Sequence, residues 1–180
     1  MSIFIAQTRD LLFNGEITLI NYLAYLIRPE ATRHNLVYGI GVSPYNAFYD
    51  MKAVKLLFFS EKRNTLAGKW FHEYIISLDW RYDSVDENDF FECCKDLGQE
   101  ISTHNGFFQV LFAVHINTGV LHAHFVVNNI DYHTGRRLNS SYEDLADLKE
   151  KINTVLGHHE YTIVPQYKGR PIKTLEIGKS

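Results

Sequence analysis

Three histidines stand close together in the segment HINTGVLHAHFVVN, which spans residues 115–128. His122 and His124 are two residues apart in an apolar run, and His115 lies seven residues before His122. Side chains alternate between the two faces of a β-strand, so His122 and His124 should share a face. If a hairpin turns within residues 116–119, His115 lies opposite His122, with Cβ atoms about 4.5–5.5 Å apart.

This geometry predicts that three imidazoles bind one face of a divalent metal ion. The other coordination positions of the ion stay open for water or substrate. The structural alternative is three half-buried histidines, each with its own hydrogen-bond partner. The third histidine, opposite the pair, favours the metal site over that alternative. A cupin-like barrel is a further reading, because Gly119, His122, His124 and Gly135 resemble its motif. However, Asn128 occupies the position of the expected acid, and the chain is too helical for a cupin.

The elements that must position these residues can be read from apolar periodicity. Two apolar runs, 107–115 and 120–129, flank the turn and predict a hairpin. Further strands are expected at 2–8, 36–42, 70–78 and 161–164, and helices at 16–28, 43–59, 86–102 and 141–157. Strands mixed with helices predict an α+β fold with a largely antiparallel central sheet, formed as one domain over residues 1–180.

Helix boundaries have their own sequence signals. Pro29 should end the first helix, and Ser43-Pro44 should open the second as an N-cap and first-turn proline. Residues 140–143, SSYE, match a capping box, and Gly157 should close the last helix.

Composition narrows the class of protein. A 180-residue chain with 46% hydrophobic residues can bury a core. Its two cysteines, Cys93 and Cys94, are neighbours, which favours packed, reduced thiols in a cytoplasmic protein. The N-terminus lacks signal-peptide features, and no apolar stretch approaches the roughly 18 residues of a membrane span.

The net charge of −3 argues against a nucleic-acid partner, but the charges are unevenly distributed. Acidic residues gather in 79–100 and 143–150, while basic residues gather elsewhere. A basic face opposite an acidic one is therefore compatible with the sequence.

A candidate nucleophile comes from the first helix. Tyr22 and Tyr25 are three residues apart and should share a helix face. A phenol with a pKa near 10 is a poor nucleophile unless a base or metal activates it. A metal can bind a phosphate oxygen and offset charge in the transition state, so a tyrosine beside the histidines predicts attack on a phosphodiester.

The order of these residues along the chain resembles that of a known protein family. A tyrosine is followed by His115-x6-His122-x-His124-xxx-Asn128 and then by YHTGRR at 132–137. This order resembles the relaxases, the mobilisation nucleases of the HUH endonuclease superfamily, in the branch that includes the agrobacterial T-DNA border nuclease. The most specific stretch is LHAHFVVNNIDYHTGRR, WFHEYIISL at 70–78 also matches, and the likeness extends from about Tyr22 to Gly157.

The resemblance implies an HUH-endonuclease-like fold and a relaxase that works in plasmid or integrative-element conjugation. A tyrosine would attack single-stranded DNA at an origin of transfer, form a 5′-phosphotyrosine and free a 3′-hydroxyl, and the reverse reaction would rejoin the strand. The implied ion is Mg²⁺ or Mn²⁺. The implied partners, besides DNA, are accessory relaxosome proteins and a coupling protein, in the cytoplasm.

The resemblance also assigns roles to residues. The segment from Tyr25 to Thr32 fits the family's spacing after the nucleophile, so Tyr25 is the predicted nucleophile and Tyr22 the reserve. Predicted DNA contacts are Arg28, Asn128, Arg136 and Arg137. The sequence departs from the family pattern at Arg28, at Ala31 and at Asn117, which stands where many relatives have an aspartate and cannot act as a general base.

Two rival functions follow from these observations. A replication-initiator nuclease of the same superfamily would place its tyrosine after the histidine pair, as Tyr161 or Tyr167 would be. A degenerate module, suggested by Asn117, would bind single-stranded DNA with a steep salt dependence and form no covalent adduct.

Overall fold

The computed structural model describes residues 2–7, 14–60, 62–79, 86–162 and 164. The five strands within this part are β1 (Ile3–Gln7), β2 (Val37–Ile40), β3 (Phe71–Ser77), β4 (Val110–His115) and β5 (His122–Asn128). The helices are α1 (Glu16–Leu26), α2 (Ala47–Leu57), α3 (Glu87–Thr103) and α4 (Tyr142–His158), with a short 3₁₀ helix, η2 (His34–Leu36).

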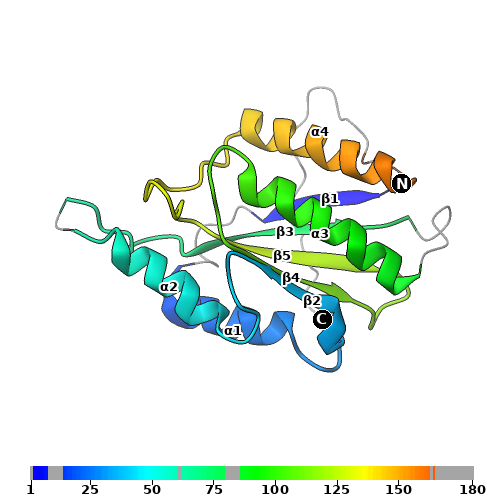
Figure 1. Cartoon of the computed structure of the whole chain (residues 1–180), viewed down its shortest axis with the longest axis horizontal. Helices are drawn as coiled ribbons and strands as arrows, with labels where there is room; N and C mark the ends of the chain where they lie inside the picture. The colour runs from blue at the N-terminus through cyan, green and yellow to red at the C-terminus, as the bar shows by residue number, and fades with distance from the viewer. Residues whose placement is uncertain (1, 8–13, 61, 80–85, 163, 165–180) are drawn as a thin grey trace, which may run out of the picture.

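The strands form one sheet in the order β1-β3-β5-β4-β2, and every neighbouring pair is antiparallel. The α+β fold with an antiparallel central sheet is therefore confirmed. The predicted hairpin is β4–β5, and its register pairs His115 with His122. Helices α3 and α4 lie on one side of the sheet, and α1 and α2 lie on the other (Figure 1).

Each side of the sheet has its own apolar core. Phe112 and Phe125 face α3 and α4, where they pack with Phe90 of α3 and Leu148 of α4. The alternate positions of the same strands face α1 and α2, and they contribute Leu111, Ala113 and Val126. Because β4 and β5 are covered on both sides, their histidines on the α1 side are polar groups in an otherwise apolar layer.

Two helix starts differ from their predictions. Helix α2 begins at Ala47, and Ser43 and Pro44 belong to a preceding turn in which the Asn46 amide donates to the Ser43 carbonyl. The capping box of α4 joins Ser141 with Asp144, one residue later than predicted. The predicted and the observed boxes both pair a serine with an acidic residue three positions later. The sequence therefore predicted the right type of cap, but one residue too early.

The last predicted strand, 161–164, is not a strand at its described positions, and residue 163 lies outside the described part. Its main contact is instead with α4, because the amide and carbonyl of Val164 both bind the side chain of Asn153. In the described part of the chain, we find no helix with the length and apolar character needed to cross a membrane.

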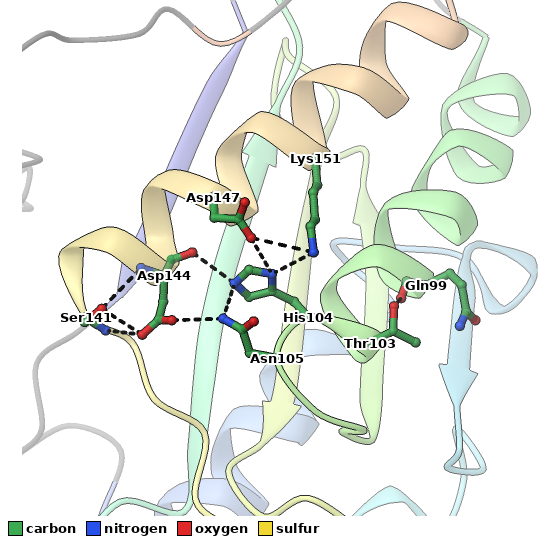
Figure 2. A network of polar contacts seen from close by, with 8 residues as sticks. All are labelled: Gln99, Thr103, His104, Asn105, Ser141, Asp144, Asp147 and Lys151. Atoms are coloured by element: carbon green, nitrogen blue, oxygen red, sulfur yellow. Dashed lines mark hydrogen bonds and ion pairs between the residues drawn. The ribbon is translucent and has the colours of Figure 1, made fainter.

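The end of α3 is tied to the start of α4 by a polar network (Figure 2). The ring of His104, which is buried, has Nε2 3.0 Å from the Asp144 carbonyl and Nδ1 3.6 Å from Asp147. Asn105 donates to the Asp144 carboxylate at 2.9 Å, and it adopts a left-handed φ of 56° that an asparagine tolerates. This network lies on the side of the sheet away from the three histidines, so we assign it to the fold.

Cys93 and Cys94 are free thiols on α3, and both are buried. Burial, with Asp96 nearby, raises the pKa of Cys93 to about 12. The thiols therefore act as apolar packing groups, as the sequence indicated.

Candidate active site

The three predicted ligands, His115, His122 and His124, converge at one end of the β4–β5 hairpin. The ring centroids of His115 and His124 are 4.5 Å apart, those of His122 and His124 5.2 Å, and those of His115 and His122 5.4 Å. One ligand atom from each residue lies within 4.8 Å of the other two. Three imidazole nitrogens gathered in this way could hold one divalent ion.

His115 has one nitrogen engaged and one free. Its Nε2 lies 2.8 Å from the Leu26 carbonyl, which can only accept, so Nε2 carries the proton. Its Nδ1 is buried and has no hydrogen-bond partner among the described residues. A buried lone pair without a partner is costly, and a metal ion bound at Nδ1 would satisfy it.

The other two imidazoles are oriented in the same manner. His124 Nδ1 lies 2.7 Å from the Glu73 carboxylate, and His122 Nδ1 lies 3.0 Å from the Val120 carbonyl. Each Nδ1 therefore donates its proton to an oxygen, and each Nε2 keeps a lone pair for the ion. A carboxylate or carbonyl behind a metal-binding histidine fixes the tautomer and the ring orientation.

Burial keeps His115 and His124 neutral. It lowers the pKa of His124 to about 3 and that of His115 to about 4. Burial also raises the pKa of Glu73 to about 7, so the apolar surroundings disfavour a charge on either member of the Glu73–His124 pair. Neutral imidazoles are ready to bind a metal at pH 7, and a cation at Nε2 would favour the ionised Glu73 carboxylate.

Tyr25, the predicted nucleophile, lies beside the histidines at the last turn of α1. Its ring meets those of His115 and His124 edge-on, with centroids 5.9 and 6.0 Å apart. The residue is 39% exposed, so a substrate can reach it. The guanidinium of Arg28, a predicted DNA contact, lies 4.0 Å from the centre of the same ring.

Tyr22, the second candidate for the nucleophile, occupies a different position. It is half-buried, and its ring packs against Phe71 with centroids 5.2 Å apart. Its hydroxyl lies 3.4 Å from Nδ1 of His124, the nitrogen that faces Glu73. Tyr22 therefore contacts the side of His124 away from the metal-binding nitrogen, which favours a supporting role.

The chain after α1 is docked onto the end of β4, and this fixes the helix beside the histidines. The Ile116 amide donates to the Ala31 carbonyl at 2.8 Å, and the Thr32 hydroxyl donates to the Val114 carbonyl at 2.6 Å. Ala31 is fully buried. Together with the bond from His115 to Leu26, these contacts set the distance between α1 and the three histidines.

Asn128, another predicted DNA contact, lies inside the protein. Its side chain is fully buried, and its amide donates to the Met51 carbonyl at 3.1 Å and to Gln109 at 2.9 Å. A side chain in this position cannot contact DNA without leaving the core. The placement corrects the sequence-based interpretation, since Asn128 ties the end of β5 to α2 and to Gln109, the residue before β4.

Arg136 and Arg137 follow β5 beyond Asn128, at the end of the strand opposite His122. Both are exposed. The Arg137 guanidinium donates to the carbonyls of Asn64 and Ala67, each at 2.8 Å, so it holds the loop before β3. Arg136 makes no side-chain hydrogen bond to the described residues and is the arginine available to a phosphate.

Glu73 is the site residue that sequence reasoning missed. The WFHEYIISL segment drew attention to His72, but His72 packs on the α3 side of the sheet, opposite Val127. Strand alternation identifies Glu73 only once the pairing is known, because β3 pairs Ser77 with His122 and therefore turns Ser77, Ile75 and Glu73 to the side of the histidines. The signal needed was the β3–β5 pairing, which the local sequence does not give.

Comparison with known proteins identifies the family of this chain. Residues 25–160 match the family "Relaxase: MobA/VirD2-like, nuclease domain". No protein of curated function matches the sequence significantly.

Several solved structures share the fold. The MobM relaxase domain, bound to plasmid pMV158 oriT DNA with Mn, has a TM-score of 0.67 at 13% identity over 96% of this chain and 95% of that chain. A second MobM complex, with a 23-nucleotide oriT DNA, has a TM-score of 0.67 at 15% identity over 96% and 94%. A chain solved for the molecular basis of vancomycin resistance transfer in Staphylococcus aureus has a TM-score of 0.56 at 13% identity over 88% and 92%.

The family match covers most of the chain, and it includes Tyr25 at the end of α1 and the three histidines. The protein therefore belongs to the relaxases, with a nuclease domain of the MobA/VirD2 type, and it is a DNA-nicking enzyme.

Proposed function

We propose that this relaxase nicks and rejoins single-stranded DNA at an origin of transfer through Tyr25, with Mn²⁺ or Mg²⁺ held by His115, His122 and His124. The observation that carries the proposal is the edge-on position of the exposed Tyr25 ring against two of the three histidines. The likeness to a relaxase domain bound to oriT DNA and Mn supports the same substrate and ion class.

The proposed chemistry is transesterification. The Tyr25 hydroxyl oxygen forms a bond to the scissile phosphorus, its proton passes to solvent, and the bond from phosphorus to the 3′-oxygen breaks. The 3′-oxygen takes a proton and leaves as a hydroxyl, and the 5′-phosphate stays on Tyr25. The reverse attack by a 3′-hydroxyl rejoins the strand. The bound ion would supply a Lewis acid at a non-bridging phosphate oxygen, which withdraws charge from the transition state.

The protein groups around the reaction have separate roles. Glu73 orients His124, and the Leu26 carbonyl orients His115. The Tyr22 hydroxyl contacts His124 at Nδ1, on the Glu73 side of the ring. Asn117 has no basic group, so exposure of Tyr25 to water provides the route for its proton. Arg136 is the proposed contact to the DNA backbone farther along the strand, with Arg137 supporting the adjacent loop.

The replication-initiator alternative needs a tyrosine after the histidine pair. Tyr161 follows α4, and its ring lies 6.2 Å from that of Phe90, in the core on the other side of the sheet. The sheet thus separates it from the histidines, and Tyr167 lies outside the described residues. The intact histidine site with an exposed tyrosine beside it also argues against a module that only binds DNA.

Covalent trapping tests the proposal. The protein would be incubated with Mn²⁺ and labelled single-stranded oligonucleotides from its own element, and adducts would be resolved on denaturing gels and mapped by mass spectrometry. We expect an adduct on Tyr25 that is absent in Tyr25→Phe, in His122→Ala and with chelator, but present in Tyr22→Phe. An adduct that survives Tyr25→Phe and is lost in Tyr161→Phe would support the replication-initiator alternative instead.

A further inference from the structure

Arg28 stands in an unusual relation to Tyr25. It lies three residues later, just past the end of α1, and its guanidinium lies 4.0 Å from the centre of the Tyr25 ring. Within the described part of the chain, no carboxylate pairs with it. The imidazoles of His115 and His124 contact the ring edge-on, and the ring of Tyr22 lies 5.7 Å from it, centroid to centroid. The partly exposed phenol thus has a cation against its ring, beside the two imidazoles, before any substrate is bound.

The backbone of Arg28 is held as firmly as its side chain. Its carbonyl accepts from the Ala31 amide at 3.0 Å and from the Thr32 amide at 3.2 Å, which forms a tight turn after the helix. Pro29 restricts the backbone at this point, and Thr32 is bound to β4. The guanidinium therefore starts from a fixed point next to the metal ligands, and its position over the ring does not depend on a flexible loop.

A tyrosine at the last turn of a helix needs such a restraint. With its side chain 39% exposed, Tyr25 could rotate about χ1 and carry its hydroxyl away from the histidines. A cation over an aromatic face is attracted by the ring quadrupole, and the planar guanidinium stacks on the ring as well. Precise placement of a reacting atom is worth large rate factors, because misplacement by about 1 Å can cost on the order of 100-fold in rate.

We propose that Arg28 is the positioning residue of the nucleophile: its guanidinium holds the Tyr25 ring in the attacking orientation before DNA arrives. This inference rests on the proposed function, in which Tyr25 attacks the phosphodiester. It differs from the sequence-based interpretation of Arg28 as a DNA contact, because the guanidinium acts through Tyr25 and not primarily through substrate affinity.

Single-turnover kinetics separate these two roles. The rate of adduct formation would be measured at saturating DNA and Mn²⁺, and DNA affinity would be measured in a Tyr25→Phe background. We expect Arg28→Ala to lower the saturating rate by about 10-fold, or about 1.4 kcal/mol, with a change in Kd of less than about 3-fold. Arg28→Lys should recover part of the rate. Added guanidinium chloride below denaturing concentrations should recover more of it than sodium chloride of equal ionic strength.

Arg33→Ala is the matched control, because Arg33 lies on the same segment but pairs with Glu87. It should leave the saturating rate unchanged. If Arg28→Ala instead weakens DNA binding and leaves the saturating rate intact, Arg28 is a phosphate contact and the proposal is wrong. Equal losses of rate and of Mn²⁺ affinity would also overturn it, since they would show a general disturbance of the site.

A measurement without DNA distinguishes failure of this inference from failure of the proposed function. With 3-fluorotyrosine incorporated, the ¹⁹F resonance of Tyr25 can be assigned by its loss in Tyr25→Phe. Positioning by Arg28 predicts that this resonance shifts and sharpens toward a mobile, solvent-exposed tyrosine in Arg28→Ala but not in Arg33→Ala. If the wild type forms no adduct on Tyr25, the proposed function fails; an unchanged resonance in Arg28→Ala refutes the positioning role alone.

Discussion

The carboxylate of Glu73 on β3 lies 2.7 Å from Nδ1 of His124 on β5, and both side chains are buried. The contact crosses two paired strands, so it is set by sheet register and not by a loop. It leaves Nε2 of His124 as the only nitrogen of that ring available to a metal ion. Glu73 thereby decides which atom His124 offers and where that atom lies.

Replacing Glu73 should therefore weaken metal binding without removing a ligand. We expect Glu73→Gln to lower Mn²⁺ affinity by about 10–100-fold, the usual effect of losing a carboxylate behind a metal-binding histidine. Isothermal titration of the metal-free protein measures this directly. Glu92→Gln, an exposed carboxylate on α3, is the control and should bind Mn²⁺ like the wild type. An unchanged affinity in Glu73→Gln would show that ring packing alone orients His124.

The protonation of His72 should make the stability of the fold depend on pH. Burial, followed by the nearby charges of Lys69 and Lys55, lowers the pKa of His72 to about 3, against 6.5 for the unfolded chain. A group with a lowered pKa binds protons better when unfolded, so its contribution is fully present above pH 6.5 and is lost as the pH falls below that value. Between pH 7 and pH 5 the loss should be about 2 kcal/mol.

Denaturant unfolding in the presence of a chelator, at pH 7 and pH 5, tests this expectation. The contribution of Glu73 to stability has the opposite pH dependence, because its raised pKa stabilises the folded state as the pH falls. The prediction therefore concerns the difference between the wild type and a His72 variant. His72→Gln should lose about 2 kcal/mol less stability than the wild type between the two pH values. An equal loss of stability in both proteins would mean that folding does not lower the pKa of His72.

The sequence predicted the site better than its surroundings. The spacing of His115, His122 and His124 sufficed because a short hairpin relates them through local rules, namely alternation and direct opposition. Glu73 and the burial of Asn128 could not be predicted in this way. Both depend on which distant elements neighbour β5, and that order, with β3 on one side and α2 beneath, is fixed by packing across the whole domain.

The two neighbouring arginines after β5 should respond differently to replacement by alanine. Arg136 is exposed and free to meet a phosphate, so Arg136→Ala should reduce the slope of log affinity against log salt by about 0.7 for single-stranded DNA, with little change in stability. Arg137 binds the carbonyls of Asn64 and Ala67, so Arg137→Ala should lower the melting temperature. Fluorescence anisotropy across salt concentrations and thermal unfolding measure the two effects. Equal salt slopes for Arg136→Ala and the wild type would remove Arg136 from the DNA surface.

Metal binding should stabilise the folded chain independently of the nucleophile. The lone pair of His115 Nδ1 is buried without a partner among the described residues, and an unfolded chain offers no such preformed site. At a Mn²⁺ concentration about 100 times Kd, the stabilisation should be about 2.7 kcal/mol, which thermal unfolding detects as a raised melting temperature.

Variants then separate the ligands from the chemistry. His115→Ala and His124→Ala should abolish the rise in melting temperature on addition of Mn²⁺, because each removes one of three ligands. Tyr25→Phe should keep the full rise while forming no DNA adduct, since the phenol hydroxyl is not among the proposed ligands. If Tyr25→Phe loses the rise as well, the tyrosine oxygen coordinates the ion in the free enzyme, and the role of Tyr25 as an uncoordinated nucleophile would have to be abandoned.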